Sequence, residues 1–146
     1  MPKPFIDLPP IENAFYDDRG RYDLHPELYF VFGSNLAGIH GAGAALDALN
    51  GYGAQYGIGK GFSGKSYAIA TKDFQIRTLP LTVIKEQVDE FIRVTNDVQG
   101  NGRYMNRFFV TAIGTGYAGY KHEQIAPMFK GCINCWLPLS WKPFLT

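Results

Sequence analysis

Short apolar runs alternate with glycine-rich turns along this chain. The runs at residues 28–32, 66–70 and 108–113 are mostly or wholly apolar, which is typical of strands that are covered on both faces. A further short run at residues 133–137 predicts a last strand. The pattern therefore predicts a sheet buried in the centre of the protein.

Three stretches have helical character. Residues 43–52 are rich in alanine and leucine, and Gly51 and Gly53 predict that this helix ends there. A second helix is predicted from a cap at Thr82 to about residue 98, and a short third helix over residues 122–129. The residues that recur at helical spacing and define the core face of the second helix are Ile84, Val88, Phe91, Ile92 and Thr95.

The order of these elements predicts the fold class. Strands and helices alternate from residue 28 onward, which favours a three-layer α/β/α sandwich with a mixed, largely parallel central sheet. Residues 27–146 are predicted to form this domain, with loops at 57–64 and 100–107, and residues 1–26 to form an irregular N-terminal arm. Ligands of such folds bind beyond the carboxyl ends of the strands.

Composition and charge argue against several classes of protein. The chain has 46% hydrophobic and 18% charged residues, which is an ordinary balance for a globular protein. Its formal net charge of +1 gives no support for a nucleic-acid partner held by neutralising many phosphates. No apolar run is long enough to cross a bilayer, and the residues after Met1 lack the apolar stretch of a secretory signal. We therefore expect a cytoplasmic protein without membrane contact.

Cys132 and Cys135 form a C-x-x-C pair, which can be a redox motif or half of a zinc site. A redox pair opens a helix, whereas residues 132–137 have the pattern of a strand. A zinc site needs a second cysteine pair or suitably spaced histidines, and the chain offers neither. We interpret both cysteines as buried structural thiols and expect no metal site.

Two glycine-rich loops follow predicted strands. The first occupies residues 33–45 and leads into the helix at 43–52, and the second occupies residues 113–120. Glycines at such junctions let backbone N–H groups approach an anion, and a helix N-terminus adds a favourable dipole. Lys72 and Asp73 end a third strand, so all three segments are expected at the same edge of the sheet. The sequence thus predicts a site for a phosphate-containing ligand, in the first place a nucleotide.

Two common nucleotide-binding signatures do not describe these loops. The chain contains no G-x-x-x-x-G-K-[ST] run. The run Gly41-Ala42-Gly43-Ala44-Ala45-Leu46 has two glycines of the dinucleotide fingerprint but leucine where the third belongs. A dehydrogenase is accordingly only weakly supported.

The ordered set of motifs resembles the macrodomain family, and within it the lysine-using ADP-ribose glycohydrolases. Phe32-Gly33-Ser34-Asn35 followed by Gly41-Ala42-Gly43 resembles the first ligand loop of that group. Thr71-Lys72 resembles the strand end that holds its lysine, and Gly114-Thr115-Gly116-Tyr117 resembles the second loop. The resemblance covers roughly residues 28–129 and extends to small stand-alone macrodomain-like proteins of bacteria and their viruses.

This resemblance implies that the ligand is ADP-ribose or a related NAD-derived nucleotide, free or attached to a macromolecule, with no cofactor. The two loops would hold the diphosphate, Tyr117 would cover the distal ribose, and Asn35 would contact that ribose or brace its loop. Lys72 would attack the ring-opened sugar as an amine. His40 is expected to contact a phosphate or to brace the loop. The expected ligand-binding residues are Asn35, His40, Gly41, Ala42, Gly43, Ala44, Ala45, Gly114, Thr115, Gly116 and Tyr117.

The chain departs from this family at its acidic residues. Ala118 stands where the group has an acid in the second loop, and Ala45 where other hydrolytic macrodomains have an aspartate. Asp73 is the substitute acid beside the catalytic candidate Lys72, although neighbouring residues of a strand point to opposite faces. Asp23 is a weak candidate for the acid that reads adenine.

Three functional hypotheses follow. The first is a macrodomain-like protein that binds ADP-ribose and hydrolyses an ADP-ribosyl linkage. The second is a non-catalytic module that senses or sequesters a signalling nucleotide, which the missing acids favour. The third is a nucleotide-dependent enzyme built on a different doubly wound sheet.

Overall fold

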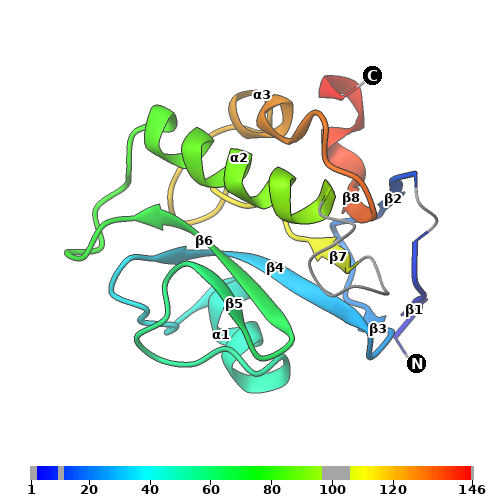
Figure 1. Cartoon of the computed structure of the whole chain (residues 1–146), viewed down its shortest axis with the longest axis horizontal. Helices are drawn as coiled ribbons and strands as arrows, with labels where there is room; N and C mark the ends of the chain where they lie inside the picture. Colours follow the sequence, from blue (N-terminus) through cyan, green and yellow to red (C-terminus); the bar gives the residue numbers. More distant parts are fainter. Residues whose placement is uncertain (1–2, 10–11, 97–105, 146) are drawn as a thin grey trace.

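A six-stranded sheet, in the order β2-β8-β7-β4-β6-β5, forms the centre of the computed structural model, which describes residues 3–9, 12–96 and 106–145 (Figure 1). Its strands are β2 (Ala14–Tyr16), β4 (Leu28–Asn35), β5 (Gly61–Ser63), β6 (Ser66–Lys72), β7 (Arg107–Val110) and β8 (Cys135–Pro138). Neighbouring strands run parallel except for β5, which pairs antiparallel with β6. The prediction of a mixed, largely parallel sheet is confirmed.

Helices lie on both faces of this sheet, an arrangement compatible with a three-layer sandwich. Figure 1 shows α1 (Gly43–Gly51) on one side, and α2 (Leu81–Asn96) and α3 (His122–Ile125) on the other. Two 3₁₀ helices, η1 (Ala126–Phe129) and η2 (Leu139–Phe144), complete the described elements after α3. No helix in the described ranges combines the length and the apolar character that crossing a membrane requires.

The core is divided between the two faces because successive residues of a strand point in opposite directions. Phe30 and Phe32 of β4 are buried on the face of α1, where Ala48 of that helix lies with them. Val31, between them, is buried on the other face with Phe91 of α2. This burial on both faces explains why the run at residues 28–32 of β4 is continuously apolar rather than alternating.

Helix α2 is fixed to the carboxyl end of β6 by a buried glutamine. The side-chain amide of Gln87 donates to the carbonyl of Ala70 (2.8 Å), and its oxygen accepts from the N–H of Ala70 (2.8 Å). Buried backbone groups need hydrogen-bond partners. The side chain of Gln87 supplies a partner for both backbone groups of Ala70, so β6 can end beneath α2 without leaving them unpaired. The two residues that follow, Thr71 and Lys72, are thereby held at the carboxyl edge of the sheet.

Several predicted strand boundaries need correction. The strand predicted at 28–32 continues to Asn35, because Gly33 and Ser34 pair with β6. The run at 108–113 leaves the sheet after Val110, although Ile113 is still buried in the core. The loop predicted at 57–64 contains β5.

The C-terminal elements also differ from the prediction. The helix predicted at 122–129 becomes 3₁₀ after Ile125, because Pro127 has no N–H to continue the α-helical hydrogen bonds. The last strand begins at Cys135 rather than at residue 133, since Asn134 has a left-handed backbone (φ 61°). The predicted end of the second helix at residue 98 and most of the loop at 100–107 lie outside the described residues.

The N-terminal arm contains more regular structure than its sequence indicated. Its strand β2 forms the edge of the central sheet beside β8, and β1 (Phe5–Ile6) pairs with β3 (Asp23–Leu24) in a separate two-stranded sheet. Tyr16 of β2 donates a buried hydrogen bond to the carbonyl of Val110 (2.6 Å). The arm therefore packs onto the domain as part of the sheet.

Candidate functional site

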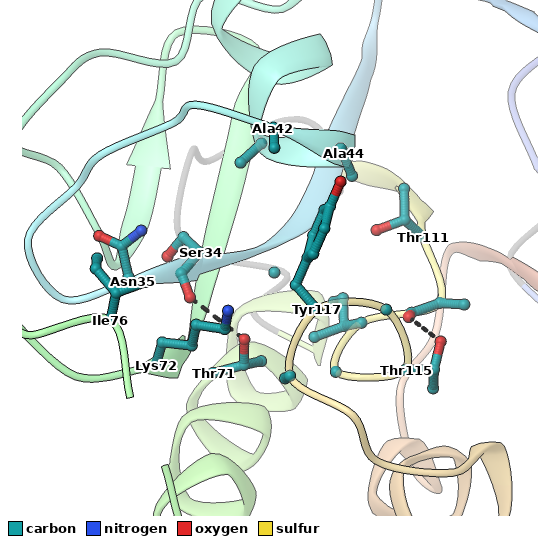
Figure 2. A pocket seen from close by; sticks show the side chains of 18 of the residues that line it. Ser34, Asn35, Ala42, Ala44, Thr71, Lys72, Ile76, Thr111, Thr115 and Tyr117 are labelled. Carbon is teal, nitrogen blue, oxygen red and sulfur yellow. Dashed lines mark hydrogen bonds between the residues drawn. The ribbon is translucent and has the colours of Figure 1, made fainter. Parts of the chain in front are cut away.

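A cavity of about 510 Å³ opens at the carboxyl edge of the sheet (Figure 2). The ends of β4 and β6, the start of α1 and the loop after β7 surround it. These are the segments that the sequence placed at one edge. The topology explains their meeting, since the carboxyl ends of adjacent parallel strands lie together.

Most of the predicted site residues line this cavity. The structure places there Asn35, Gly41, Ala42, Gly43, Ala44, Ala45, Lys72, Gly114, Thr115, Gly116 and Tyr117. It does not bring His40 or Asp73 to the cavity wall. Lys72 is the only charged residue among the described residues that form the wall.

The first loop ends in a helix N-terminus without a side-chain cap. Ala42 is the N-cap residue of α1 and makes no side-chain cap hydrogen bond, and the first turn contains no acidic residue. The first N–H groups of a helix have no partner within the helix, so those of Gly43, Ala44 and Ala45 remain to be satisfied. Gly43 has a left-handed backbone (φ 59°), which glycine adopts without strain. The helix start therefore offers donors and a positive dipole end to the cavity.

The second loop offers further backbone donors. Gly114 has φ 79°, and a Cβ at this position would approach the side chain of Ile125 to 3.0 Å, so glycine is required for the turn. The carbonyls of Gly114 and Gly116 accept from Tyr120 (2.9 Å) and Gly119 (3.0 Å), which closes the loop. Within the described residues, the N–H groups of Gly116 and Tyr117 have no acceptor. Donors of this kind in a concave loop bind anions.

Asn35 braces the first loop. Its side-chain amide donates to the carbonyl of Ile39 (2.8 Å), and its side-chain oxygen accepts from the N–H of the same residue (3.0 Å). Asn35 also lines the cavity and is a register partner of Lys72 on the neighbouring strand. Of the two roles expected for this residue, the structure shows the bracing one.

His40 lies beneath the first loop rather than in the cavity. Its ring is fully buried between Phe32 and Tyr56, at centroid distances of 5.3 and 6.1 Å. Its Nε2 atom is 3.0 Å from the carbonyl oxygen of Gln55. A phosphate contact by His40 is therefore not part of this site, and its role is to hold the loop against the segment around Gln55.

Lys72 and Tyr117 face each other across the cavity. The Nζ atom of Lys72 is 5.7 Å from the centroid of the Tyr117 ring, within the range of a weak cation–π contact. Tyr117 is 76% exposed, and Figure 2 shows its ring standing between the first loop and Lys72. The lysine is therefore available to an anionic or electrophilic ligand, with an aromatic surface beside it.

Asp73 belongs to a turn and not to the cavity. Its carboxylate accepts from the N–H groups of Gln75 (2.8 Å) and Arg77 (3.0 Å) and from the Nε of Arg77 (3.0 Å). These bonds, those from the Arg77 and Gln75 backbone foremost, lower the pKa of Asp73 from its ordinary value of 3.8. Asp73 lies one residue beyond the end of β6, and these bonds hold its side chain in the turn rather than in the cavity.

The pH dependence of stability reports on this turn. A carboxyl group whose pKa is lowered in the folded state contributes stability that is present above its unfolded pKa and lost as pH falls through the folded pKa. We expect Asp73→Asn to be less stable than the wild type at pH 7, and the difference to shrink once the pH falls below the ordinary value of 3.8 and to vanish as it passes through the lowered folded-state pKa. Urea denaturation across this range measures it. A difference that stays constant down to low pH would show that the charge of Asp73 is not the cause.

A second cavity of about 830 Å³ adjoins the first along α1. The two share Ala44, Thr111 and Ala112, so they meet between α1 and the segment after β7. Tyr22 and Asp23 of the N-terminal arm lie in the wall of the second cavity. Asp23, the candidate adenine reader, is therefore near the site but outside the main cavity.

The C-x-x-C cysteines are buried and unoxidised, as their interpretation as structural thiols requires. Burial raises the pKa of the Cys135 thiol, and a hydrogen bond from Cys135 lowers that of Cys132. Asn13 donates to the carbonyl of Cys132 (2.9 Å) and accepts from the N–H of Cys135 (3.0 Å). The pair thus joins the N-terminal arm to the turn before β8. The described residues contain no group of histidine, cysteine and acidic side chains that could hold a metal ion.

Three residues of the cavity wall lie outside the loops and motifs that the sequence indicated. Thr111 and Ala112 follow β7 directly, and the rule that ligands bind beyond strand ends would have indicated them. Ile76 lines the cavity from a turn that returns toward it, and the sequence around it contains no pattern that indicates a ligand site.

Comparisons of the chain with protein-family models, curated proteins and solved structures gave no match.

Proposed function

We propose that the protein binds ADP-ribose, or a related NAD-derived nucleotide, in the cavity at the carboxyl edge of the sheet. The observation that supports this most is the pair of backbone donor clusters, at the start of α1 and at Gly116 and Tyr117, in the wall of one cavity. Peptide N–H groups bind a diphosphate without requiring a strongly basic protein. The chain has a net charge of only +1. Binding by peptide N–H groups makes that charge compatible with the macrodomain-like ligand site that the sequence motifs imply.

The proposed orientation of the ligand follows from the distribution of groups in the wall. The diphosphate lies between the two donor clusters, and the terminal ribose extends to the end where Asn35 and Lys72 are register partners. The adenosine then extends past Thr111 and Ala112 toward the second cavity, where Tyr22 and Asp23 lie. In this orientation Tyr117 covers the ligand from the solvent side.

The chemical groups in the wall favour binding over carboxylate-assisted hydrolysis. No acidic residue is among the described residues that line the cavity, and Asp73 is engaged by Arg77. Lys72 is the one amine among the described residues of the wall, and it would act as a nucleophile in its neutral form. The lack of an acid favours the second hypothesis, a module that binds the nucleotide without turning it over.

Calorimetric titration with ADP-ribose tests the proposal, with AMP and NAD as comparison ligands. We expect saturable binding of ADP-ribose and weaker binding of AMP, which lacks the diphosphate and the terminal ribose. Binding of NAD or AMP in preference to ADP-ribose would favour a nucleotide-dependent enzyme of another class. Absence of heat with ADP-ribose at near-millimolar concentration would contradict the proposal.

Replacement of Lys72 by methionine removes the only charge of the described cavity wall while keeping an unbranched side chain. A hydrogen bond to a charged group contributes about 1.5–3 kcal/mol, so we expect affinity for ADP-ribose to fall by roughly 10- to 100-fold. Calorimetry on the variant measures the change. Lys60→Met is the control, because Lys60 lies outside the cavity and its Nζ atom is 3.9 Å from a carboxylate oxygen of Glu90. Equal affinities of the two variants would exclude a role for Lys72.

A turnover assay with an ADP-ribosylated substrate tests hydrolysis with the same variants. Hydrolysis would be established if the wild type releases ADP-ribose and Lys72→Met does not.

A further inference from the structure

A tight turn follows Lys72 and returns the chain to the cavity. Lys72 and Thr78 form an isolated antiparallel bridge, and within it the N–H of Asp73 donates to the carbonyl of Arg77 (2.8 Å). The Asp73 carboxylate binds the backbone of Gln75 and Arg77, and the Arg77 guanidinium binds both the carboxylate and the Gln75 side chain (2.7 Å). These contacts fix the conformation of the turn, although much of its surface is in solvent.

Ile76 is held in this turn with a left-handed backbone, at φ 65°. This conformation is costly for any residue with a Cβ, and it is rarest for β-branched residues. The hydrophobic core does not explain the choice of isoleucine, because Ile76 is 42% exposed and belongs to neither core cluster. Glycine or asparagine would form the same turn at lower cost.

The strained isoleucine lies in the cavity wall. It lines the cavity together with Lys72 and Asn35, and Figure 2 shows it beside Asn35. Its neighbour Phe74 is 67% exposed but does not line the cavity. The turn therefore presents one apolar side chain to the cavity, at the end where Lys72 and Asn35 lie.

We propose that Ile76 is a specificity-determining residue, held by the turn so that its side chain packs against the terminal sugar of the ligand and favours ADP-ribose over nucleotides that end at the diphosphate. This inference rests on the proposed function and deepens it. The diphosphate is bound by backbone donors that would serve ADP equally well, so discrimination must come from the Lys72 end of the cavity. A ribose presents C–H groups as well as hydroxyls, and the apolar wall formed by Ile76 complements them. Strain retained at a ligand site at the expense of stability is a recognised feature of such sites.

The experiment measures affinity for ADP-ribose and for ADP with the wild type, Ile76→Gly, Ile76→Asn and Phe74→Ala. We expect both substitutions of Ile76 to weaken ADP-ribose binding about 10-fold while leaving ADP binding unchanged. Both variants should melt at or above the wild-type temperature, because the left-handed backbone no longer opposes a β-branched side chain. Phe74→Ala, in the same turn but outside the cavity, should bind both nucleotides as the wild type does.

The outcomes separate this inference from the proposed function. Wild-type affinity for ADP-ribose in both Ile76 variants would overturn the inference alone, as would an equal loss of ADP and ADP-ribose binding. An effect of Phe74→Ala as large as that of Ile76→Gly would also overturn it, because the turn as a whole would then be responsible. Failure of the wild type to bind ADP-ribose would overturn the proposed function, and the inference with it.

Discussion

Substitution of Gly38 by alanine is expected to destabilise the protein by more than about 3 kcal/mol, the largest effect on stability that we predict. Gly38 has φ 71°, and a Cβ there would lie 2.4 Å from the carbonyl carbon of Gly57. The N–H of Gly57 donates to the carbonyl of Gly38 (3.0 Å), which ties the two segments together, and the N–H of Gly38 donates to the carbonyl of Asn35 (2.9 Å) within the first loop. The overlap is with backbone, so neither segment can yield without losing these bonds. Urea denaturation at pH 7 measures the loss.

Gly57→Ala is the matched control for this prediction. Gly57 also has a positive φ, of 89°, but a Cβ there meets no atom within 4 Å. Its substitution should therefore cost only the conformational strain, about 1–2 kcal/mol. Equal losses in Gly38→Ala and Gly57→Ala would show that strain alone, and not the close approach of the two segments, governs both positions. Because Gly38 lies in the first loop, its substitution should also weaken ligand binding in whatever fraction remains folded.

The main strands were predictable because burial on both faces of a sheet has a direct signature in the sequence. β4, β6 and β7 each contain a continuous apolar run, and no helix of useful length fits within runs so short. The last residues of β4 were not predictable in this way. Gly33 and Ser34 have little strand propensity by themselves, and they are extended because Ile69 and Ala70 of β6 pair with them.

The sequence predicted which segments form the site, because the topology of a parallel sheet determines where those segments meet. Once the strands are parallel, their carboxyl ends must meet, and the two glycine-rich loops and Lys72 meet with them. The direction of individual side chains depends on tertiary contacts instead. His40 is drawn beneath its loop by Phe32 and Gln55.

The position and the backbone conformation of Ile76 could not be predicted from the local sequence. Its position in the cavity wall depends on the closure of a turn by Asp73 and Arg77, and its left-handed backbone runs against the preference of isoleucine. Sequence rules are derived from unstrained structures, so they place a glycine or asparagine at such a position. A strained residue of this kind lowers stability, so it is expected to persist where its side chain serves function rather than folding. The wall of a ligand cavity is such a place.

A carboxylate introduced at Gly116 is expected to abolish most of the affinity for ADP-ribose while leaving the fold intact. Gly116 lies in the cavity wall, a Cβ there meets no atom within 4 Å, and its backbone is outside the left-handed region. Gly116→Asp would place a negative charge among the backbone donors that the proposed diphosphate needs. Two like charges 4 Å apart repel by about 4 kcal/mol at an effective dielectric constant of 20, so affinity should fall by at least about 100-fold.

Gly116→Asn separates this charge effect from the effect of size. Asparagine has nearly the same shape as aspartate without its charge, and we expect it to weaken binding by less than about 10-fold. The Gly116→Asp defect should also shrink as ionic strength rises, since exposed charges are screened by salt. Calorimetry with both variants, with and without 0.5 M salt, measures these differences. Equal defects in the two variants would mean that Gly116 is needed for space, and that the anionic part of the ligand binds elsewhere in the cavity.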